Sequence, residues 1–115
     1  MEIIDYYGKI IKNSKNLKKL KEIAKRLETI KKFEKDIKNI EKIDEYLVEG
    51  YFKIGIYTLR KGKRNKTERY KARKMLNYYL KKMYKIIDED EKIRKKVKRN
   101  YFGEAVKDLY INYKK

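Results

Sequence analysis

Cysteine, histidine, tryptophan, proline and glutamine are absent from this chain of 115 residues, and serine occurs once, as Ser14. Without cysteine there is no disulfide, no thiolate metal site and no cysteine nucleophile. Without histidine no Ser-His-Asp or Cys-His triad can form, and zinc sites built from carboxylates alone are rare. These absences exclude most catalytic arrangements, so we expect a binding protein that uses no cofactor and no metal rather than an enzyme.

Carboxylates offer the one remaining route to catalysis, through metal-assisted hydrolysis of a phosphodiester. The acids of the run 88–91 are adjacent in sequence. Neighbouring residues on a helix point in different directions and cannot all face one ion. We therefore interpret this run as a cap and a dipole partner for the helix that follows it.

Long apolar runs are also missing, since no stretch approaches the roughly 18 residues that a membrane-spanning helix needs. The N-terminus lacks the basic and apolar regions of a signal peptide. A hydrophobic content of 41% is too high for a disordered basic tail, so residues 1–115 are expected to form a single folded domain. We expect a soluble cytoplasmic protein without membrane contact, and its amino-acid usage is typical of a thermophile.

Apolar residues recur at steps of three and four, which predicts an all-α fold, a compact bundle of about five helices. The first helix is expected over 2–12, with Ser14 or Asn16 capping the next. The apolar pattern of 17–40 fits one helix or two, with Thr29 as a possible internal cap. The next helix is expected to begin at Asp44 and to stop at Gly62.

The second half of the chain follows the same pattern. Thr67 is predicted to cap a fourth helix, and Gly55 indicates a close contact between helices. The expected core stripe of the fourth helix is Ala72, Leu76, Tyr79, Leu80, Met83 and Ile87. A fifth helix should follow the acidic run with Gly103 as a possible interruption. Its expected stripe is Ile93, Val97, Tyr101, Ala105, Leu109 and Tyr113.

Charge is the feature that is distributed most unevenly along the sequence, because most of the net charge of +18 comes from two clusters. One cluster spans positions 60–74 with Glu68 as its single acid. Its basic residues are Arg60, Lys61, Lys63, Arg64, Lys66, Arg69, Lys71, Arg73 and Lys74. The other spans 92–99 and contains no acid. A basic loop at a helix start suits phosphate recognition, which favours nucleic acid for the first cluster. Isolated lysines elsewhere fit a solvated surface.

Tyrosine occurs 12 times, and its position relative to the apolar stripe decides its role. Tyr79 is expected in the core, whereas Tyr78 is expected to point outward among lysines. An exposed ring there can stack on an unpaired base, a contact of about 1 to 3 kcal/mol, or it can pack against a partner subunit. Four other tyrosines are expected in the core or at an interface: Tyr51, Tyr57, Tyr101 and Tyr113.

Three short motifs occur in the order and position expected of a known family. The first is Ile30-Lys31-Lys32-Phe33 followed by Ile37. The second is Lys53-Ile54-Gly55 with Arg60, and it departs from the family pattern at Ile56, Tyr57 and Leu59. The third is Tyr101-Phe102-Gly103-Glu104-Ala105-Val106, followed by Tyr110 and Tyr113. Across residues 30–115 the chain resembles the small helical subunit of type III-A (Csm) CRISPR effector complexes.

The resemblance implies a non-catalytic subunit of a CRISPR-Cas interference complex, present in several copies along the crRNA-bearing subunits and contacting target RNA. Its motifs place Lys31, Lys32, Lys53 and Arg60 on two helices expected to lie side by side. Lys61, Lys63 and Arg64 then extend this basic patch from the loop. The full set of expected nucleic-acid contacts is Lys31, Lys32, Lys53, Arg60, Lys61, Lys63, Arg64, Lys66, Arg69, Arg73 and Tyr78.

The expected partners are therefore crRNA or target RNA, single-stranded or hybrid, and other subunits of the effector complex, with a homo-oligomer or dimer as a further possibility. Two functions of other classes remain open. A basic architectural DNA-binding protein would prefer duplex DNA. A helical adaptor that binds only proteins would function almost independently of salt.

Overall fold

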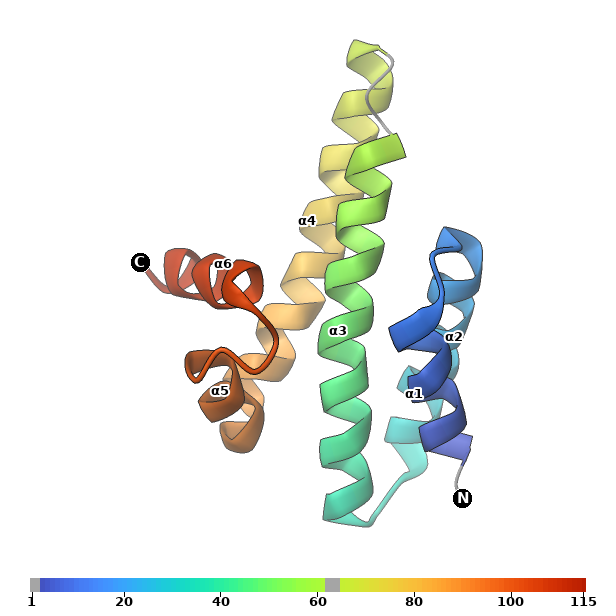
Figure 1. Ribbon diagram of the computed structural model, residues 1–115, viewed down its shortest axis with the longest axis vertical. Coiled ribbons are helices and arrows are strands. Elements are labelled where there is room, and N and C mark those ends of the chain that lie inside the picture. Colours follow the sequence, from blue (N-terminus) through green and yellow to red (C-terminus); the bar gives the residue numbers. More distant parts are fainter. Residues whose placement is uncertain (1–2, 62–64) are drawn as a thin grey trace.

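The computed structural model describes residues 3–61 and 65–115, and within these ranges it consists of helices joined by short turns (Figure 1). The helices are α1 (Ile3–Asn13), α2 (Leu17–Phe33), α3 (Ile37–Lys61), α4 (Lys66–Glu89), α5 (Glu91–Lys98) and α6 (Glu104–Lys114). No strand occurs in the described ranges, which confirms the all-α prediction. The expected number of five helices is wrong, because six are present in this part of the chain.

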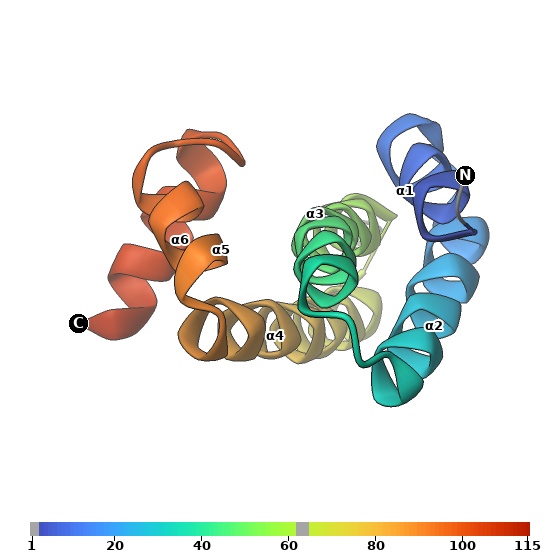
Figure 2. The ribbon, with the colours of Figure 1, turned by 90° about the horizontal axis from the view of Figure 1, so that it is seen from below.

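The long helix α3 lies at the centre and contacts α1, α2, α4 and α5. A view along α3 shows α1 and α2 on one side of it and α5 and α6 on the other, with α4 running beneath α3 toward α5 (Figure 2). Buried side chains from every described helix join one apolar cluster, including Ile4, Leu20, Leu47, Met83, Ile93 and Tyr110. The molecule is elongated along α3, with extents of 45 × 32 × 22 Å.

The chain between α2 and α3 turns at residues 34–36, so the apolar pattern of 17–40 belongs to two helices. Asn16 caps α2 by accepting a hydrogen bond from the Lys19 amide, as expected. Thr29 is not a cap, since its hydroxyl donates to the Lys25 carbonyl within α2. The predicted start of α3 at Asp44 is also wrong. The helix already begins at Ile37, and Asp44 is buried in its middle.

The predicted cap of α4 lies two residues from the true one, whereas the predicted cap of α5 lies within the acidic run as expected. Asn65 rather than Thr67 caps α4, by accepting from the Glu68 amide at 2.8 Å. In the acidic run, Asp90 accepts from the Ile93 amide and starts α5, which confirms its predicted role as a cap. Gly62, the expected end of α3, lies outside the described residues, and α3 ends at Lys61.

A turn between α5 and α6 interrupts the expected fifth helix. Gly103 has a φ of 97°, in the left-handed region that favours glycine, and Asn100 has a φ of 69°. The turn shifts the helix register, so the predicted four-residue stripe is wrong at Tyr101, Ala105 and Tyr113, whereas Leu109 is partly buried against the core as expected. Val106 and Tyr110 become the buried residues of α6. Two residues of the predicted stripe, Tyr101 and Tyr113, are about half exposed.

The packing of α3 on α4 agrees with the sequence. A methyl group added at Gly55 would lie 2.8 Å from Leu76 Cδ1, so the absence of a side chain there lets the two helices approach closely. The predicted core stripe of α4 is confirmed. Ala72, Leu80, Met83 and Ile87 are buried, and Leu76 and Tyr79 are partly buried against them.

None of the described helices combines the length and the apolar character that crossing a bilayer requires.

Candidate nucleic-acid interface

One face of α4 carries only basic, aromatic and amide side chains. The sequence contains no acid between Glu68 and Asp88. Exposed side chains recur at steps of three and four opposite the core stripe: Lys66, Tyr70, Arg73, Lys74, Asn77, Tyr78, Lys81 and Lys85. Two of its rings, Tyr70 and Tyr78, are 61% and 51% exposed and lie about 12 Å apart along the axis. We call this surface the α4 face.

The end of the α3–α4 hairpin gathers the most basic part of the predicted site. Six of its exposed residues, which we call the hairpin tip, are Arg60, Lys61, Lys66, Arg69, Tyr70 and Arg73, and the exposed acid Glu68 lies among them in the sequence. The last four of these six line a hollow of about 250 Å³. Among the described residues no acid forms an ion pair with any of these cations. The predicted contacts Lys63 and Arg64 lie outside the described residues.

A groove between α2 and α4 extends the basic surface toward the other end of the molecule. An ion pair of 3.0 Å between Lys82 Nζ and Glu28 Oε2 divides it into two hollows. The first, here the tyrosine hollow, measures about 350 Å³ and is lined by Lys21, Ala24, Lys25, Glu28, Tyr78, Tyr79 and Lys82. The second, here the lysine hollow, measures about 420 Å³ and is lined by Lys31, Lys32, Lys82 and Lys85, the acids Glu28 and Glu89, and the apolar or aromatic residues Leu47, Tyr51 and Ile86.

Tyr78 has the orientation that the sequence predicts, with its ring exposed and Tyr79 partly buried beside it. Lys82 Nζ lies 4.7 Å from the centre of the Tyr78 ring. Tyr51 is buried and Tyr57 partly buried, which confirms their expected place in the core. Tyr101 is 54% exposed and is not a core residue of this chain, although its hydroxyl donates to Glu45; the alternative place at an interface stays a prediction.

Lys53 has a structural contact instead of an exposed position. Its ammonium donates to the carbonyl oxygens of Ile11, Lys12 and Ser14 at 2.6, 3.2 and 2.8 Å. These carbonyls belong to the C-terminal end of α1 and the turn after it, where a helix has acceptors without internal partners. Burial lowers the pKa of the Lys53 ammonium. Lys53 therefore ties α3 to the end of α1.

The two helices that carry the family-like motifs do pack together, but they run antiparallel. Lys31 lies beside the first part of α3, where its ammonium is 2.7 Å from Asp44 Oδ1. Arg60 lies sixteen residues beyond Asp44 along α3, about 24 Å at the rise of an α-helix. The structure thus groups Lys31 and Lys32 with Tyr78 in the α2–α4 groove, and it groups Arg60 with the hairpin tip.

Several residues of this surface were not in the predicted set. Tyr70 could have been predicted from the sequence, because it occurs two helical turns before Tyr78 in the same acid-free segment. Lys21 and Lys25 could not have been predicted from the sequence, since their place opposite Tyr78 depends on how α2 and α4 flank α3. A sequence pattern on one helix contains no information about which helix faces it.

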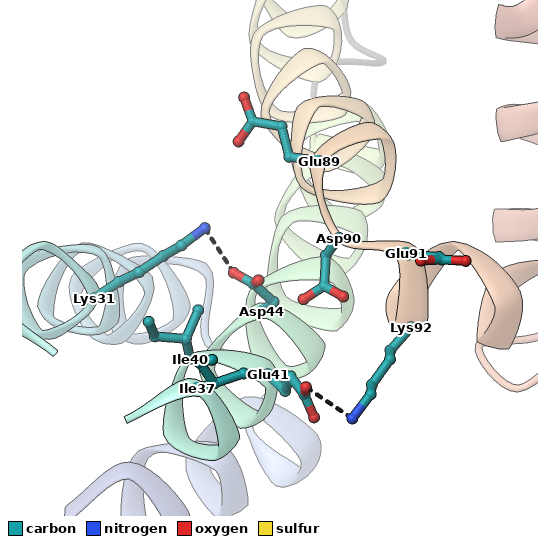
Figure 3. A pocket seen from close by; sticks show the side chains of 9 residues that line it. All are labelled: Lys31, Ile37, Ile40, Glu41, Asp44, Glu89, Asp90, Glu91 and Lys92. Carbon is teal, nitrogen blue, oxygen red and sulfur yellow. Dashed lines mark ion pairs between the residues drawn. The ribbon is translucent and has the colours of Figure 1, made fainter. Parts of the chain in front are cut away.

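Acids gather in a separate pocket where the end of α2, the start of α3 and the α4–α5 junction meet (Figure 3). Its carboxylates come from Glu41, Asp44, Glu89, Asp90 and Glu91. Three of them form ion pairs: Asp44 with Lys31, Glu41 with Lys92 at 3.0 Å, and Glu91 with Lys95 at 3.4 Å. No group of three potential ligands in the described part of the chain is arranged to hold a metal ion.

Asp44 titrates abnormally in this pocket. Burial raises the pKa of its carboxyl from 3.8 to about 6, and the nearby carboxyl of Asp90 adds to the rise while Lys31 opposes it. The folded protein then holds this proton more tightly than the unfolded chain. The contribution of Asp44 to stability is therefore constant below about pH 4 and decreases as the pH rises toward 6.

Replacing Asp44 by asparagine should remove this dependence. The asparagine side chain cannot ionise, but its amide retains an oxygen for Lys31 and gains a donor for Asp90. We expect Asp44→Asn to raise the free energy of unfolding at pH 7.5 by up to about 3 kcal/mol, with little effect at pH 4. Urea unfolding at both pH values measures it. A loss of stability at pH 7.5 would show that the ion pair with Lys31 outweighs the burial cost.

Comparison with protein-family models, curated proteins and solved structures gives no match to this chain. The likeness to the CRISPR subunit therefore depends on the three motifs alone.

Proposed function

We propose that this protein binds single-stranded or hybrid RNA through the α4 face, without recognising a defined sequence and without catalysis. One observation carries the proposal: α4 presents cations and two exposed tyrosines at helical spacing, with no acid between Glu68 and Asp88. Cations along such a face neutralise backbone phosphates, and rings between them stack on unpaired bases. A duplex leaves no base unpaired for this stacking, so the two tyrosines favour a single strand, and a hybrid would be held through its phosphates alone.

The proposal also includes the role of this protein in the cell. The motifs at Ile30–Phe33, Lys53–Arg60 and Tyr101–Val106 support a small subunit of a type III-A CRISPR effector complex, in which the other subunits supply nuclease activity. The partners would be crRNA or target RNA and the neighbouring subunits, in the cytoplasm. Purification of the native complex, followed by identification of the proteins and RNA that accompany this chain, tests this assignment directly.

RNA binding should depend steeply on salt. Each phosphate contact with a single strand contributes about 0.7 to the slope of log K against log salt concentration, because a condensed counterion is released. If about five cations of the α4 face make contacts, we expect a slope of about −3.5 for an unstructured RNA of mixed sequence. Fluorescence anisotropy titrations at several salt concentrations measure it.

The same titrations separate this function from the other two. A slope near zero, with no measurable RNA binding at low salt, would favour a protein-binding adaptor. Tighter binding to one duplex DNA sequence than to single-stranded RNA would favour an architectural DNA-binding protein.

A further inference from the structure

We propose that the tyrosine hollow between α2 and α4 is a subsite that receives one unstacked nucleobase and selects bases carrying an exocyclic amino group over uracil. The inference depends on the proposed RNA-binding function, and it assigns that function a specific contact. It makes α2 part of the binding surface, which the α4 face alone does not.

The hollow has the shape and lining that a base requires. Its volume of about 350 Å³ lies at the lower end of the range for small-ligand sites, about 300 to 1,000 Å³. Tyr78 forms one side and is 51% exposed, and Tyr79 packs edge-on against it at a centroid distance of 5.1 Å. Tyr79 and Lys82, whose Nζ lies 4.7 Å from the centre of the Tyr78 ring, thus hold Tyr78 in place, while about half of the residue stays exposed for a stacking contact.

Cations surround the hollow on both helices. Lys21 and Lys25 come from α2 and Lys82 from α4. The next hollow along the groove adds Lys32 and Lys85, together with the acid Glu89, across the ion pair of Lys82 with Glu28. Lys31 also lines that hollow, but its ammonium is paired with Asp44. A base inserted beside Tyr78 would leave its two flanking phosphates near these ammonium groups.

Glu28 gives the hollow its selectivity. Its Oε2 accepts from Lys82 and from the Tyr51 hydroxyl, which fixes the carboxylate at the floor of the groove. Within the described residues, no donor reaches its Oε1. A carboxylate oxygen accepts from the amino group of cytosine, and adenine and guanine also carry amino donors. Uracil presents carbonyl oxygens on both sides of its single N–H and has no amino group to donate to the carboxylate. The Glu28 carboxylate should therefore bind uracil less tightly than these bases.

Octamers of cytidine and of uridine test the subsite, because both are pyrimidines of similar size that differ in the edge facing Glu28. We expect the wild-type protein to bind the cytidine octamer about fivefold more tightly at about 50 mM salt. Tyr78→Ala should weaken binding of the cytidine octamer about tenfold, and Tyr78→Phe should retain it. Tyr6→Ala, which removes an equally exposed tyrosine from α1, should change neither affinity.

Glu28→Gln should remove the preference for cytidine while circular dichroism shows an unchanged helical content. If this variant does not fold, the three tyrosine variants still decide the stacking contact. Equal affinity of the wild-type protein for both octamers, or equal effects of Tyr78→Ala and Tyr6→Ala, would overturn the subsite and leave the proposed function intact. Failure of the wild-type protein to bind either octamer would overturn both.

Discussion

Arg69→Glu together with Arg73→Glu is expected to weaken binding of single-stranded RNA by at least about 25-fold at about 100 mM salt. This factor follows from the counterion slope, because a contact with a slope of about 0.7 contributes about fivefold at this salt concentration and two contacts contribute about 25-fold. Both residues line the hollow at the hairpin tip and are exposed. Anisotropy titration of the double variant measures the loss.

The matched control reverses Lys9 and Lys19, which are exposed on α1 and α2 outside the α4 face and the groove. It changes the net charge by the same amount, and we expect a loss of less than about threefold. Both variants should fold, since each replaces exposed polar side chains on helices. Equal losses would mean that the charge of +18 attracts RNA without a defined site, and the assignment of the hairpin tip and the α4 face would then be withdrawn.

Lys53→Met is expected to lower the free energy of unfolding by about 2 to 3 kcal/mol without weakening RNA binding. The substitution keeps the aliphatic length of the side chain but removes the ammonium that holds three carbonyl groups at the end of α1. Hydrogen bonds from a charged donor contribute about 1.5 to 3 kcal/mol, and part of the loss is recovered when water reaches the carbonyls. Urea unfolding measures it.

Arg60→Met, on the same helix, is expected to have the opposite effects: an almost unchanged stability and a loss of RNA affinity. Arg60 is exposed at the hairpin tip, and within the described residues its guanidinium contacts the Tyr57 ring, at 5.7 Å from the centroid, but no acid. We expect the free energy of unfolding of the Arg60→Met variant to change by less than about 0.5 kcal/mol, and its affinity for RNA to fall about fivefold at about 100 mM salt. If folded Lys53→Met lost as much RNA affinity as Arg60→Met, Lys53 would belong to the interface as the sequence predicts.

The buried position of Asp44 in the middle of α3 could not be predicted from the local sequence pattern. An aspartate between apolar runs looks like an N-cap, because capping and burial both place a carboxylate beside the first apolar residues of a helix. The choice between them depends on partners that are remote in sequence. Here Lys31 of α2 lies 2.7 Å away, and burial among α2, α3 and the α4–α5 junction follows from the antiparallel packing.

The sequence by itself determined the helical fold, the core stripe of α4, the close approach at Gly55 and the outward position of Tyr78. Each depends on the period of a single helix or on the size of a single residue, and such properties are local. Only the tertiary structure decided that Lys31 and Lys32 lie with Tyr78, that Lys53 holds the end of α1, and that Lys21 and Lys25 face α4. The three-residue turn after Phe33 reverses the chain and sets these pairings, because it decides which end of α2 lies beside which end of α3.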